Sequence, residues 1–256
     1  MKTVKGLHEK MGTFENANTS FHQAARCKRY TNEVLAFSMV KEEELLRATE
    51  EIQNLTYRQG EYKIFKVFEP KERLIMALPF YDRVVQHMIC NAIQPVFENG
   101  FYYHSYACRS GKGMHAASDT LYQWMYETEV KQGLRMYAFK GDISKYFASI
   151  PHDKLKDENR RYIGDKKALM LMDDIIDHNG ILPDGVGIPV GNLTSQLFAN
   201  VYGNKLDKFC KHVLHIPYFV RYMDDFIILS DDLEQLKEWV KRIEEFLENE
   251  MLLHIN

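Results

Sequence analysis

Residues 218–229 read YFVRYMDDFIIL, a run of aromatic and aliphatic side chains interrupted by two adjacent acids. The apolar residues on both sides favour two short strands, Tyr218–Tyr222 and Phe226–Leu229, joined by a turn. Aspartate is a poor strand residue, and two neighbouring carboxylates at ~4 Å repel each other by about 1 to 4 kcal/mol. A divalent cation removes that cost, so the pattern favours metal-binding acids over an ordinary solvent-exposed hairpin turn.

A third acid occupies a comparable place earlier in the chain. Asp142 follows the apolar run at 136–139 and precedes Ile143. By itself it is typical of a helix cap, but with Asp224 and Asp225 it provides three carboxylates from the ends of two strands. Such a set suits a pair of Mg²⁺ ions ~3.5–4 Å apart, the arrangement used for in-line phosphoryl transfer.

The remaining hydrophobic periodicities predict helices and strands along the whole chain. Helices are expected over 41–57, 82–97 with Asp82 as the cap, 114–130, 152–162, 165–178, 192–213 and 233–249. Strands are expected over 62–68, ended by Pro70, and over 74–78 and 134–139, with another beginning at 251–256. Helices and strands are mixed without a strict alternation, so the predicted fold class is α+β.

The composition is that of an ordinary globular protein. The chain has 256 residues, of which 45% are hydrophobic and 27% charged, enough for one large domain or two small ones. Its four cysteines lack the paired spacing of a disulfide framework or a zinc site. We find no secretory leader and no apolar run near the roughly 18 residues of a membrane helix. We therefore expect a cytoplasmic protein that does not enter the membrane.

The net charge of −3 conceals an asymmetry between the halves. Residues 1–150 hold 20 Lys and Arg against 17 Asp and Glu, whereas residues 151–256 hold 13 against 19. The segment 99–118 has no acid, and its Arg109 and Lys112 lie among four aromatic residues. A phosphate or nucleic-acid groove and an exposed loop explain this clustering equally well.

Lys112 also stands in SGKG at 110–113, which we compared with a phosphate-binding P-loop. Tyr106 occupies the position of the first P-loop glycine, and Gly113 that of the Ser or Thr after the lysine. The sequence therefore argues against a P-loop, although a Gly-Lys-Gly segment before a helix can still bind phosphate.

Five motifs in order resemble those of reverse transcriptases. KGDISKYFASI at 140–150, GIPVGNLTSQ at 187–196 and RYMDD at 221–225 resemble successive palm motifs. Residues 71–86 and 104–115 resemble finger motifs of the bacterial branch related to group II introns. The resemblance covers about residues 25–256 and implies the fingers, at 1–133, and the palm, at 134–256, of a right-hand polymerase.

Within that branch, VGNLTSQ at 190–196 resembles the variant found in diversity-generating retroelement enzymes. Intron-type enzymes usually carry Gln where Val190 stands and Pro where Gln196 stands. The likeness implies error-prone copying, because a valine offers shape where a glutamine would offer a hydrogen bond. Residues 252–256 resemble the first half of the next motif, so we expect this sequence to lack the primer grip and the thumb.

The resemblance implies an RNA-directed DNA polymerase that makes cDNA by nucleotidyl transfer. Asp142, Asp224 and Asp225 would hold two Mg²⁺ ions, for which Mn²⁺ can substitute, and the Ile143 carbonyl would be an extra ligand. The substrate-binding residues implied are Arg73 at the incoming base or template, Arg109 and Lys112 at the triphosphate, Phe147 beneath the sugar, and Val190 and Gly191 beside the nascent pair.

The implied partners are a template RNA, a primer, dNTPs and an accessory protein of the retroelement. Two alternatives stay open at this stage. One is a defence-associated reverse transcriptase that makes DNA without copying a template, and the other is a non-catalytic RNA-binding scaffold.

Overall fold

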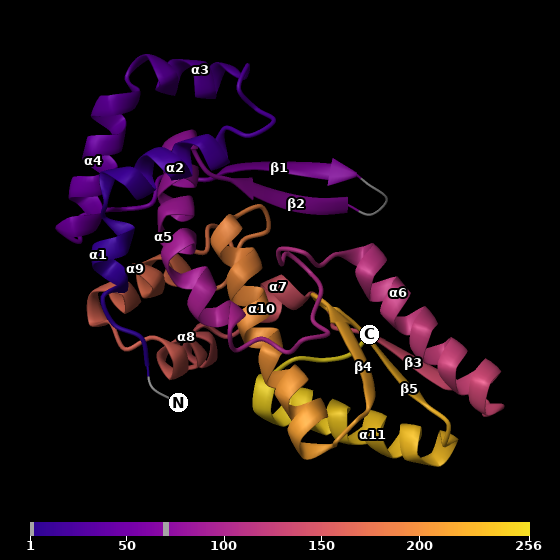
Figure 1. Ribbon diagram of the computed structural model, residues 1–256. Helices are drawn as coiled ribbons and strands as arrows, with labels where there is room; N and C mark the ends of the chain where they lie inside the picture. The colour runs from indigo at the N-terminus through magenta and orange to yellow at the C-terminus, as the bar shows by residue number, and fades with distance from the viewer. Residues whose placement is uncertain (1–2, 69–71) are drawn as a thin grey trace. The chain divides into compact units, whose positions relative to one another are not determined.

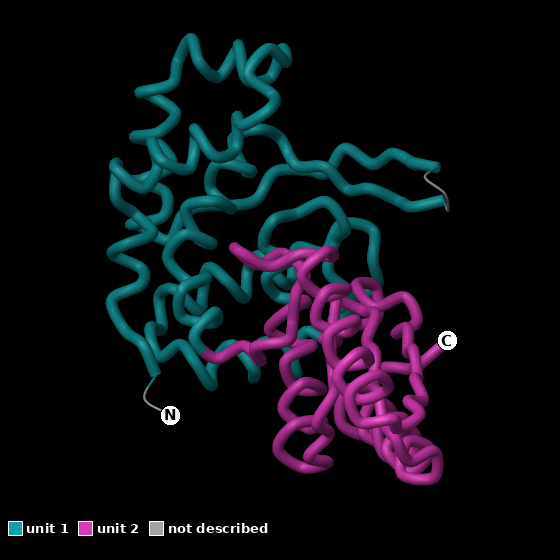
Figure 2. The backbone as a smooth tube through the Cα atoms, turned by 45° about the vertical axis from the view of Figure 1, so that its right-hand side comes forward, with its two compact units in different colours: residues 1–99, 152–198 teal, residues 100–151, 199–256 magenta. Residues whose placement is uncertain are grey.

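The computed structural model describes residues 3–68 and 72–256, which divide into two compact units (Figures 1 and 2). Unit 1 is formed from Met1–Asn99 and His152–Phe198, and unit 2 from Gly100–Pro151 and Ala199–Asn256. Each unit thus combines two separate stretches of chain. The division into fingers at 1–133 and palm at 134–256 is a functional one and stays a prediction.

Unit 1 is mainly helical and carries one two-stranded sheet (Figure 1). Strand β1 (Lys63–Phe68) pairs antiparallel with β2 (Glu72–Ala77), as the sequence predicts. Pro70 and Lys71, which the sequence analysis placed at this hairpin, lie outside the described residues. The helices are α1 (Leu7–Met11), α2 (Phe14–Ala24), α3 (Asn32–Met39), α4 (Lys41–Gln53), α5 (Phe80–Glu98), α8 (His152–Tyr162), α9 (Lys166–Asp177) and the first residues of α10 (Leu193–Lys208).

Asp165 shows how local sequence and tertiary contacts together begin two helices of unit 1. Its side chain caps α9 by accepting from the backbone N–H groups of Lys167 and Ala168. Its other carboxylate oxygen accepts from the N–H groups of Leu7 and His8, at 2.8 and 3.0 Å. One carboxylate therefore satisfies the N-termini of both α9 and α1.

The prediction that Asp82 caps a helix is wrong. Helix α5 begins at Phe80 after Pro79, so Asp82 lies inside its first turn. The Asp82 side chain is buried and accepts from the Tyr57 hydroxyl at 2.8 Å and the Gly60 N–H at 3.1 Å. This acid ties α5 to the segment that follows α4, because its hydrogen-bond partners come from elsewhere in the chain.

Unit 2 is built around a three-stranded antiparallel sheet with strand order β3-β5-β4 (Figure 1). The strands are β3 (Tyr137–Asp142), β4 (Tyr218–Tyr222) and β5 (Asp225–Ser230). Helix α6 (Met114–Met125) contacts β4, and α11 (Leu233–Phe246) contacts β3 and β5. The unit also holds α7 (Tyr146–Ser149), the rest of α10 and three π-helical segments, η1 (Tyr126–Lys131), η2 (Phe209–Val213) and η3 (Leu247–Met251). The α+β class is confirmed.

The strands predicted at 134–139 and 251–256 differ from the structure. The strand expected at 134–139 is β3, which begins only at Tyr137. The reason is that the Leu134 and Met136 N–H groups bond back to the Thr128 carbonyl and the Glu129 carboxylate at the end of η1. Of the strand expected at 251–256, an antiparallel bridge between Ile255 and Ile143 is present.

Candidate active site

The register of the sheet places two of the predicted acids side by side. Asp142, the last residue of β3, is paired with Asp225, the first residue of β5, and Tyr222 at the end of β4 is also paired with Asp225. Directly opposed residues in antiparallel strands project from the same face of a sheet. The two carboxylates therefore share one face at one end of the sheet.

The third acid lies in the turn between β4 and β5. Only Met223 and Asp224 separate the two strands, and Met223 has φ 60°, the positive value that the first position of a type II′ turn requires. The Asp224 carbonyl accepts from the Ile143 N–H at 3.2 Å, which fixes the turn against the end of β3. Because the N–H and C=O of an extended residue point to the same side, the Ile143 carbonyl faces this turn as well.

Two of the acids have partners that the sequence analysis missed. The Asn256 side-chain amide donates to Asp142 Oδ2 at 2.6 Å, and its backbone N–H donates to the Asp142 carbonyl. Lys140 Nζ lies 3.1 Å from Asp225 Oδ1. Lys140 is two residues before Asp142, so the alternation of the strand places it on the same face as the acids. Its pairing with Asp225 depends on the register between β3 and β5. Asn256 is 114 residues from Asp142, and no local signal joins them.

The next question is whether the three acids, with these partners, can hold a metal ion. Within residues 3–68 and 72–256, no three His, Cys, Asp or Glu side chains are gathered closely enough to hold a metal ion. The chemistry of the donors nevertheless fits Mg²⁺, because three carboxylates and a backbone carbonyl at one strand end are all hard oxygen ligands. An ion here would compete with Asn256 for Asp142 and with Lys140 for Asp225.

Beneath the acids, on the opposite face of the sheet, lies an ion pair that is fully buried. Arg221 in β4 and Asp207 in α10 both have side chains that are 0% exposed. Arg221 Nε and Nη2 donate to the two Asp207 carboxylate oxygens at 2.6 and 2.8 Å. Burial raises the pKa of the Asp207 carboxyl, and the adjacent guanidinium opposes that shift. An arginine inside an apolar strand was itself a signal, since a buried guanidinium needs an acidic partner.

Arg109 and Lys112 belong to the loop that precedes α6, and both cations bond within that loop. Arg109 Nη1 donates to the Tyr102 and Ser105 carbonyls, each at 2.7 Å. Lys112 Nζ donates to the Tyr103 carbonyl and lies 3.5 Å from the centre of the Tyr103 ring. These contacts hold the loop together, and a role at a triphosphate stays a prediction for both residues.

The same loop carries a histidine with a lowered pKa. His104 accepts or donates a hydrogen bond at Nδ1 with the Tyr106 hydroxyl and packs edge-on against Trp124. Burial, with the nearby Lys112 and Lys211 charges, lowers the pKa of His104 to about 4. The imidazole is thus still neutral well below pH 7, and the positive charge of this loop comes from Arg109 and Lys112.

The remaining predicted substrate-binding residues, Phe147, Val190, Gly191 and Arg73, lie in different elements. Phe147 lies in α7 of unit 2, half-buried, with its ring edge-on to Tyr146. Val190 and Gly191 lie in unit 1, where the Val190 carbonyl accepts from the Met76 N–H of β2 at 3.1 Å. Arg73 is exposed on β2, paired with Val67.

The local structure explains why position 191 is a glycine. Its φ is +119°, and a Cβ placed there would lie 3.2 Å from the Met76 carbonyl oxygen. Glycine therefore permits the close approach of this loop to β2. The sequence analysis assigned the glycine to an approach toward the nascent pair, which stays a prediction.

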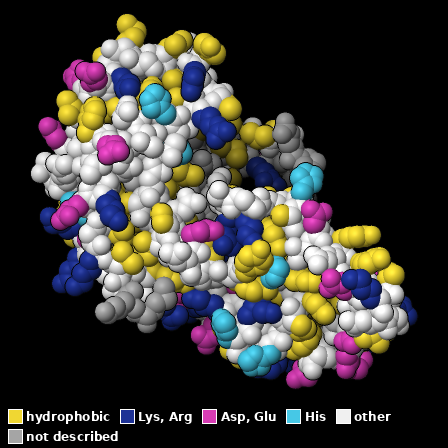
Figure 3. Space-filling model, in the orientation of Figure 1, with side chains coloured by type: hydrophobic (Ala, Val, Ile, Leu, Met, Phe, Trp, Pro, Cys, Tyr) yellow, Lys and Arg dark blue, Asp and Glu magenta, His cyan; other side chains and the backbone are white. Residues whose placement is uncertain are grey.

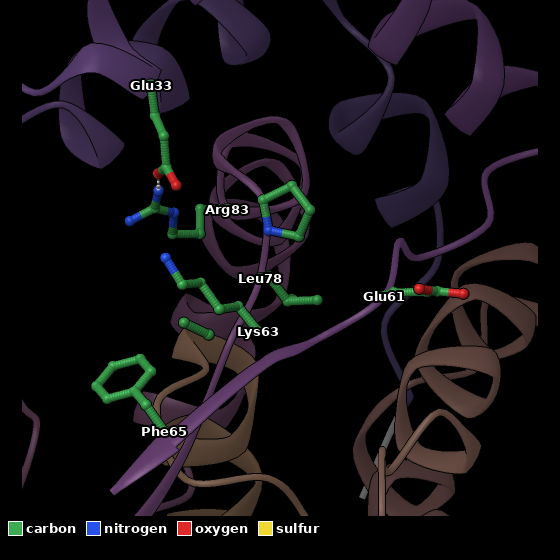
Figure 4. Close-up of a pocket in the computed structure, with 8 residues that line it drawn as sticks. Glu33, Glu61, Lys63, Phe65, Leu78 and Arg83 are labelled. Atoms are coloured by element: carbon green, nitrogen blue, oxygen red, sulfur yellow. Dashed lines mark hydrogen bonds and ion pairs between the residues drawn. The ribbon is translucent and has the colours of Figure 1, made fainter. Parts of the chain in front are cut away.

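A pocket of about 490 Å³ lies in unit 1 between β1 and the start of α5 (Figure 4). The Lys63 side chain extends toward Arg83, whose guanidinium is directed at Glu33 of α3 and is paired with it. Phe65 is also part of the lining, and none of the predicted substrate-binding residues is. On the face drawn in Figure 3, the Lys and Arg side chains of the described residues are spread among acidic ones.

Comparisons with known proteins point to the family that the sequence motifs resemble. A family model described as reverse transcriptase (RNA-dependent DNA polymerase) matches residues 66–256. Protein YkfC of Escherichia coli is 28% identical over 134 residues, which are 50% of this chain and 34% of that protein. An uncharacterized 91 kDa protein in a cob intron of Schizosaccharomyces pombe is 29% identical over 137 residues, 52% of this chain and 16% of that protein.

Two solved structures show the same fold. The apo telomerase of Candida tropicalis superposes with a TM-score of 0.56 at 14% identity. The match covers 78% of this chain and 49% of the telomerase chain. The telomerase of Candida albicans, solved with a fragment of telomeric RNA, superposes with a TM-score of 0.57 at 10% identity. The match covers 79% of this chain and 43% of the telomerase chain. The fingers-and-palm fold is thereby confirmed.

The chain spans about a third or less of the curated relatives it matches. Of the part that the structure describes, no helix combines the length and the apolar character needed to cross a bilayer.

Proposed function

The chain belongs to the reverse transcriptase family, and from this premise we propose that it extends a primer with dNTPs on an RNA template. The observation that carries the proposal is the end of the β3-β5-β4 sheet. There Asp142 and Asp225 are opposed in register, and Asp224 is held beside them by the Ile143 N–H. No structural need of an ordinary hairpin explains three acids at this place.

Asp142, Asp224 and Asp225 would hold Mg²⁺, or Mn²⁺ in its place, with the Ile143 carbonyl as a further ligand. When bound, the two ions lower the pKa of the primer 3′-hydroxyl and neutralise the charge on the phosphates and the leaving pyrophosphate. Lys140 restrains the Asp225 carboxylate, and Asn256 restrains Asp142. These two contacts would reduce the mutual repulsion of the acids while no ion is bound, and a bound ion would take their place.

For the substrate we propose the roles that the family resemblance implies. Lys112 and Arg109 would attract the triphosphate, Phe147 would lie under the sugar, and Arg73 would contact the base or the template. Support for Lys112 comes from its position before α6, where Gly111 and Gly113 both have positive φ and the helix N-terminus follows. Val190 and Gly191 would face the nascent pair.

The narrower proposal is an error-prone enzyme of a diversity-generating retroelement, working with an accessory protein. It rests on Val190, whose aliphatic side chain offers no hydrogen bond to a misplaced nucleotide. Sequencing the products made on a defined RNA should show errors concentrated at template adenines, and Val190→Gln should reduce them. Equal fidelity at all four template bases would reject this narrower proposal while leaving the polymerase activity intact.

The polymerase proposal is tested with Asp224→Asn, which keeps the size of the side chain and removes its charge. The matched control is Asp231→Asn, an exposed acid just beyond the other end of β5. Primer extension on RNA should fall by roughly a thousandfold in Asp224→Asn, equivalent to ~4 kcal/mol in the barrier, and stay unchanged in the control.

Circular dichroism and the melting temperature establish that both variants fold. A folded Asp224→Asn protein with full activity would refute the assignment of the acids. Reactions without RNA separate the alternatives, since extension that needs no RNA would indicate template-independent synthesis and no extension under any condition would indicate a scaffold.

A further inference from the structure

We propose that Arg221 is a positioning residue, which holds the Met223–Asp224 turn in the geometry that the metal-binding acids need. The inference rests on the proposed function, because it assumes that Asp224 and Asp225 bind the ions. It concerns a residue that touches none of the reacting groups and acts through the backbone of the turn.

The contact that carries the inference runs from the guanidinium to the turn. Arg221 Nη1 donates to the Met223 carbonyl at 2.9 Å, two residues further along its own chain. Met223 is the residue with positive φ, and its carbonyl belongs to the peptide group that leads into Asp224. A bond to this carbonyl therefore sets the plane of that peptide, and with it the direction in which the Asp224 side chain leaves the backbone.

The guanidinium can fix the turn because it is itself fixed on every side. Both Asp207 oxygens accept from Nε and Nη2, the Asn200 side-chain oxygen lies 3.3 Å from Nη1, and the Ser105 hydroxyl lies 3.1 Å from Nη2. Such a fork-to-fork pair defines both position and plane. Lysine has a single nitrogen and cannot serve Asp207 and the Met223 carbonyl in the same way.

The same residue joins the turn to the loop that carries Arg109 and Lys112. The Arg221 N–H donates to the His104 carbonyl at 3.0 Å, and the Arg221 carbonyl accepts from the Tyr106 N–H at 2.9 Å. Asn200, which contacts the guanidinium, also donates to the Ala107 carbonyl at 2.8 Å. Backbone and side chain of Arg221 thus connect the acidic turn with the cationic loop inside unit 2.

The test compares Arg221→Lys with Tyr202→Phe and Asp224→Asn in the full chain. Tyr202→Phe is the matched control, because it removes one buried hydrogen bond of α10, the 2.6 Å bond to the Met251 carbonyl, far along the chain from the turn. The probe is Mn²⁺, titrated by electron paramagnetic resonance, with the Mg²⁺ midpoint of primer extension as the second readout. Circular dichroism first establishes that each variant is folded under the assay conditions, because an unfolded fraction would lower the apparent metal affinity.

We expect Arg221→Lys to weaken Mn²⁺ binding by about 10- to 100-fold, the range found for outer partners of metal ligands, and to raise the Mg²⁺ midpoint in parallel. The KM for dNTP should change less than kcat. Tyr202→Phe should lower the melting temperature and leave both metal readouts unchanged. Unchanged Mn²⁺ affinity in a folded Arg221→Lys protein would overturn the inference.

A second variant covers the case in which Arg221→Lys does not fold. Gly203→Ala keeps every charge and presses on the guanidinium, since the added Cβ would lie 2.6 Å from Arg221 Nη1. It should also weaken Mn²⁺ binding, and an unchanged affinity would reject the positioning role. If Asp224→Asn itself binds Mn²⁺ as well as the unsubstituted protein, the proposed function fails, and this outcome is distinct from the failure of Arg221 alone.

Discussion

Gly203 in α10 gives the sharpest test of the packing around the buried ion pair. Two effects of Gly203→Ala oppose each other. Alanine is the better helix residue by about 1 kcal/mol, which alone would stabilise the protein. Against this, the new Cβ would meet Arg221 Nη1 at 2.6 Å, Arg221 Cζ at 2.7 Å and the Tyr146 hydroxyl at 2.9 Å. Carbon atoms do not approach polar atoms that closely, so something must move.

The neighbours of that Cβ have little freedom to move. The guanidinium is held by Asp207 at 2.6 and 2.8 Å, and the Tyr146 hydroxyl donates to the Ala199 carbonyl at 2.7 Å. Inserting a methyl group into a packed core costs about 1–3 kcal/mol, and separating the partners of a buried ion pair costs about 3–5 kcal/mol. A partial shift of the pair, offset by the helix propensity of alanine, leaves a net destabilisation of about 1–3 kcal/mol.

The measurement is thermal and urea unfolding of the two proteins, followed by circular dichroism. A loss of this size lowers Tm by roughly 3–10 °C in a chain of this length. Combining Gly203→Ala with Arg221→Lys should give less than the sum of the separate losses, because lysine lacks the branched head that meets the new methyl group. A Gly203→Ala protein that is more stable by about 1 kcal/mol would show helix propensity alone and refute the reasoning.

Three further predictions follow from the site. Phe147→Val should increase incorporation of ribonucleotides, because an aromatic ring under the sugar leaves no space for a 2′-hydroxyl; an unchanged ratio of rNTP to dNTP use would show that Phe147 serves packing only. The pKa of His104 is about 4 in the folded protein against 6.5 without burial, so only the unfolded chain gains this proton as the pH falls from about 6.5 to 4, and stability is lost over that window. His104→Phe should make the unfolding free energy less dependent on pH there, and an equal slope would contradict the assignment. Gly191→Ala, at φ +119°, should cost about 1–3 kcal/mol in unfolding free energy, and no loss would show that this loop can move away from Met76.

Local pattern was sufficient for the elements that form from neighbouring residues. The hairpin at 218–229 is confirmed, with β4 at the predicted Tyr218–Tyr222, whereas β5 begins at Asp225, one residue before the predicted Phe226. Helix α8 has the predicted bounds His152–Tyr162. In both cases the hydrophobic period and the turn residues lie within one short stretch of chain, so the sequence specifies the element without help from the rest of the fold.

The sequence also placed the three acids at strand ends, but it could not supply their partners. The alternation of a strand decides which side an aspartate faces, and that is a local property. Which residue meets it across the sheet depends on the register and on segments far away. Asn256 reaches Asp142 only because the chain returns after α11 to bridge Ile143.

The tertiary structure alone decided what the buried polar residues do. Asp82 looked like a cap because it precedes an apolar stripe, yet its hydrogen bonds go to Tyr57 and Gly60. The sequence showed Arg221 only as the first residue of the motif at 221–225. Its partners Asp207 and Ser105 are 14 and 116 residues away. A buried charge must find its partners wherever packing brings them, so its role is set by the three-dimensional arrangement and is invisible in the spacing of the sequence.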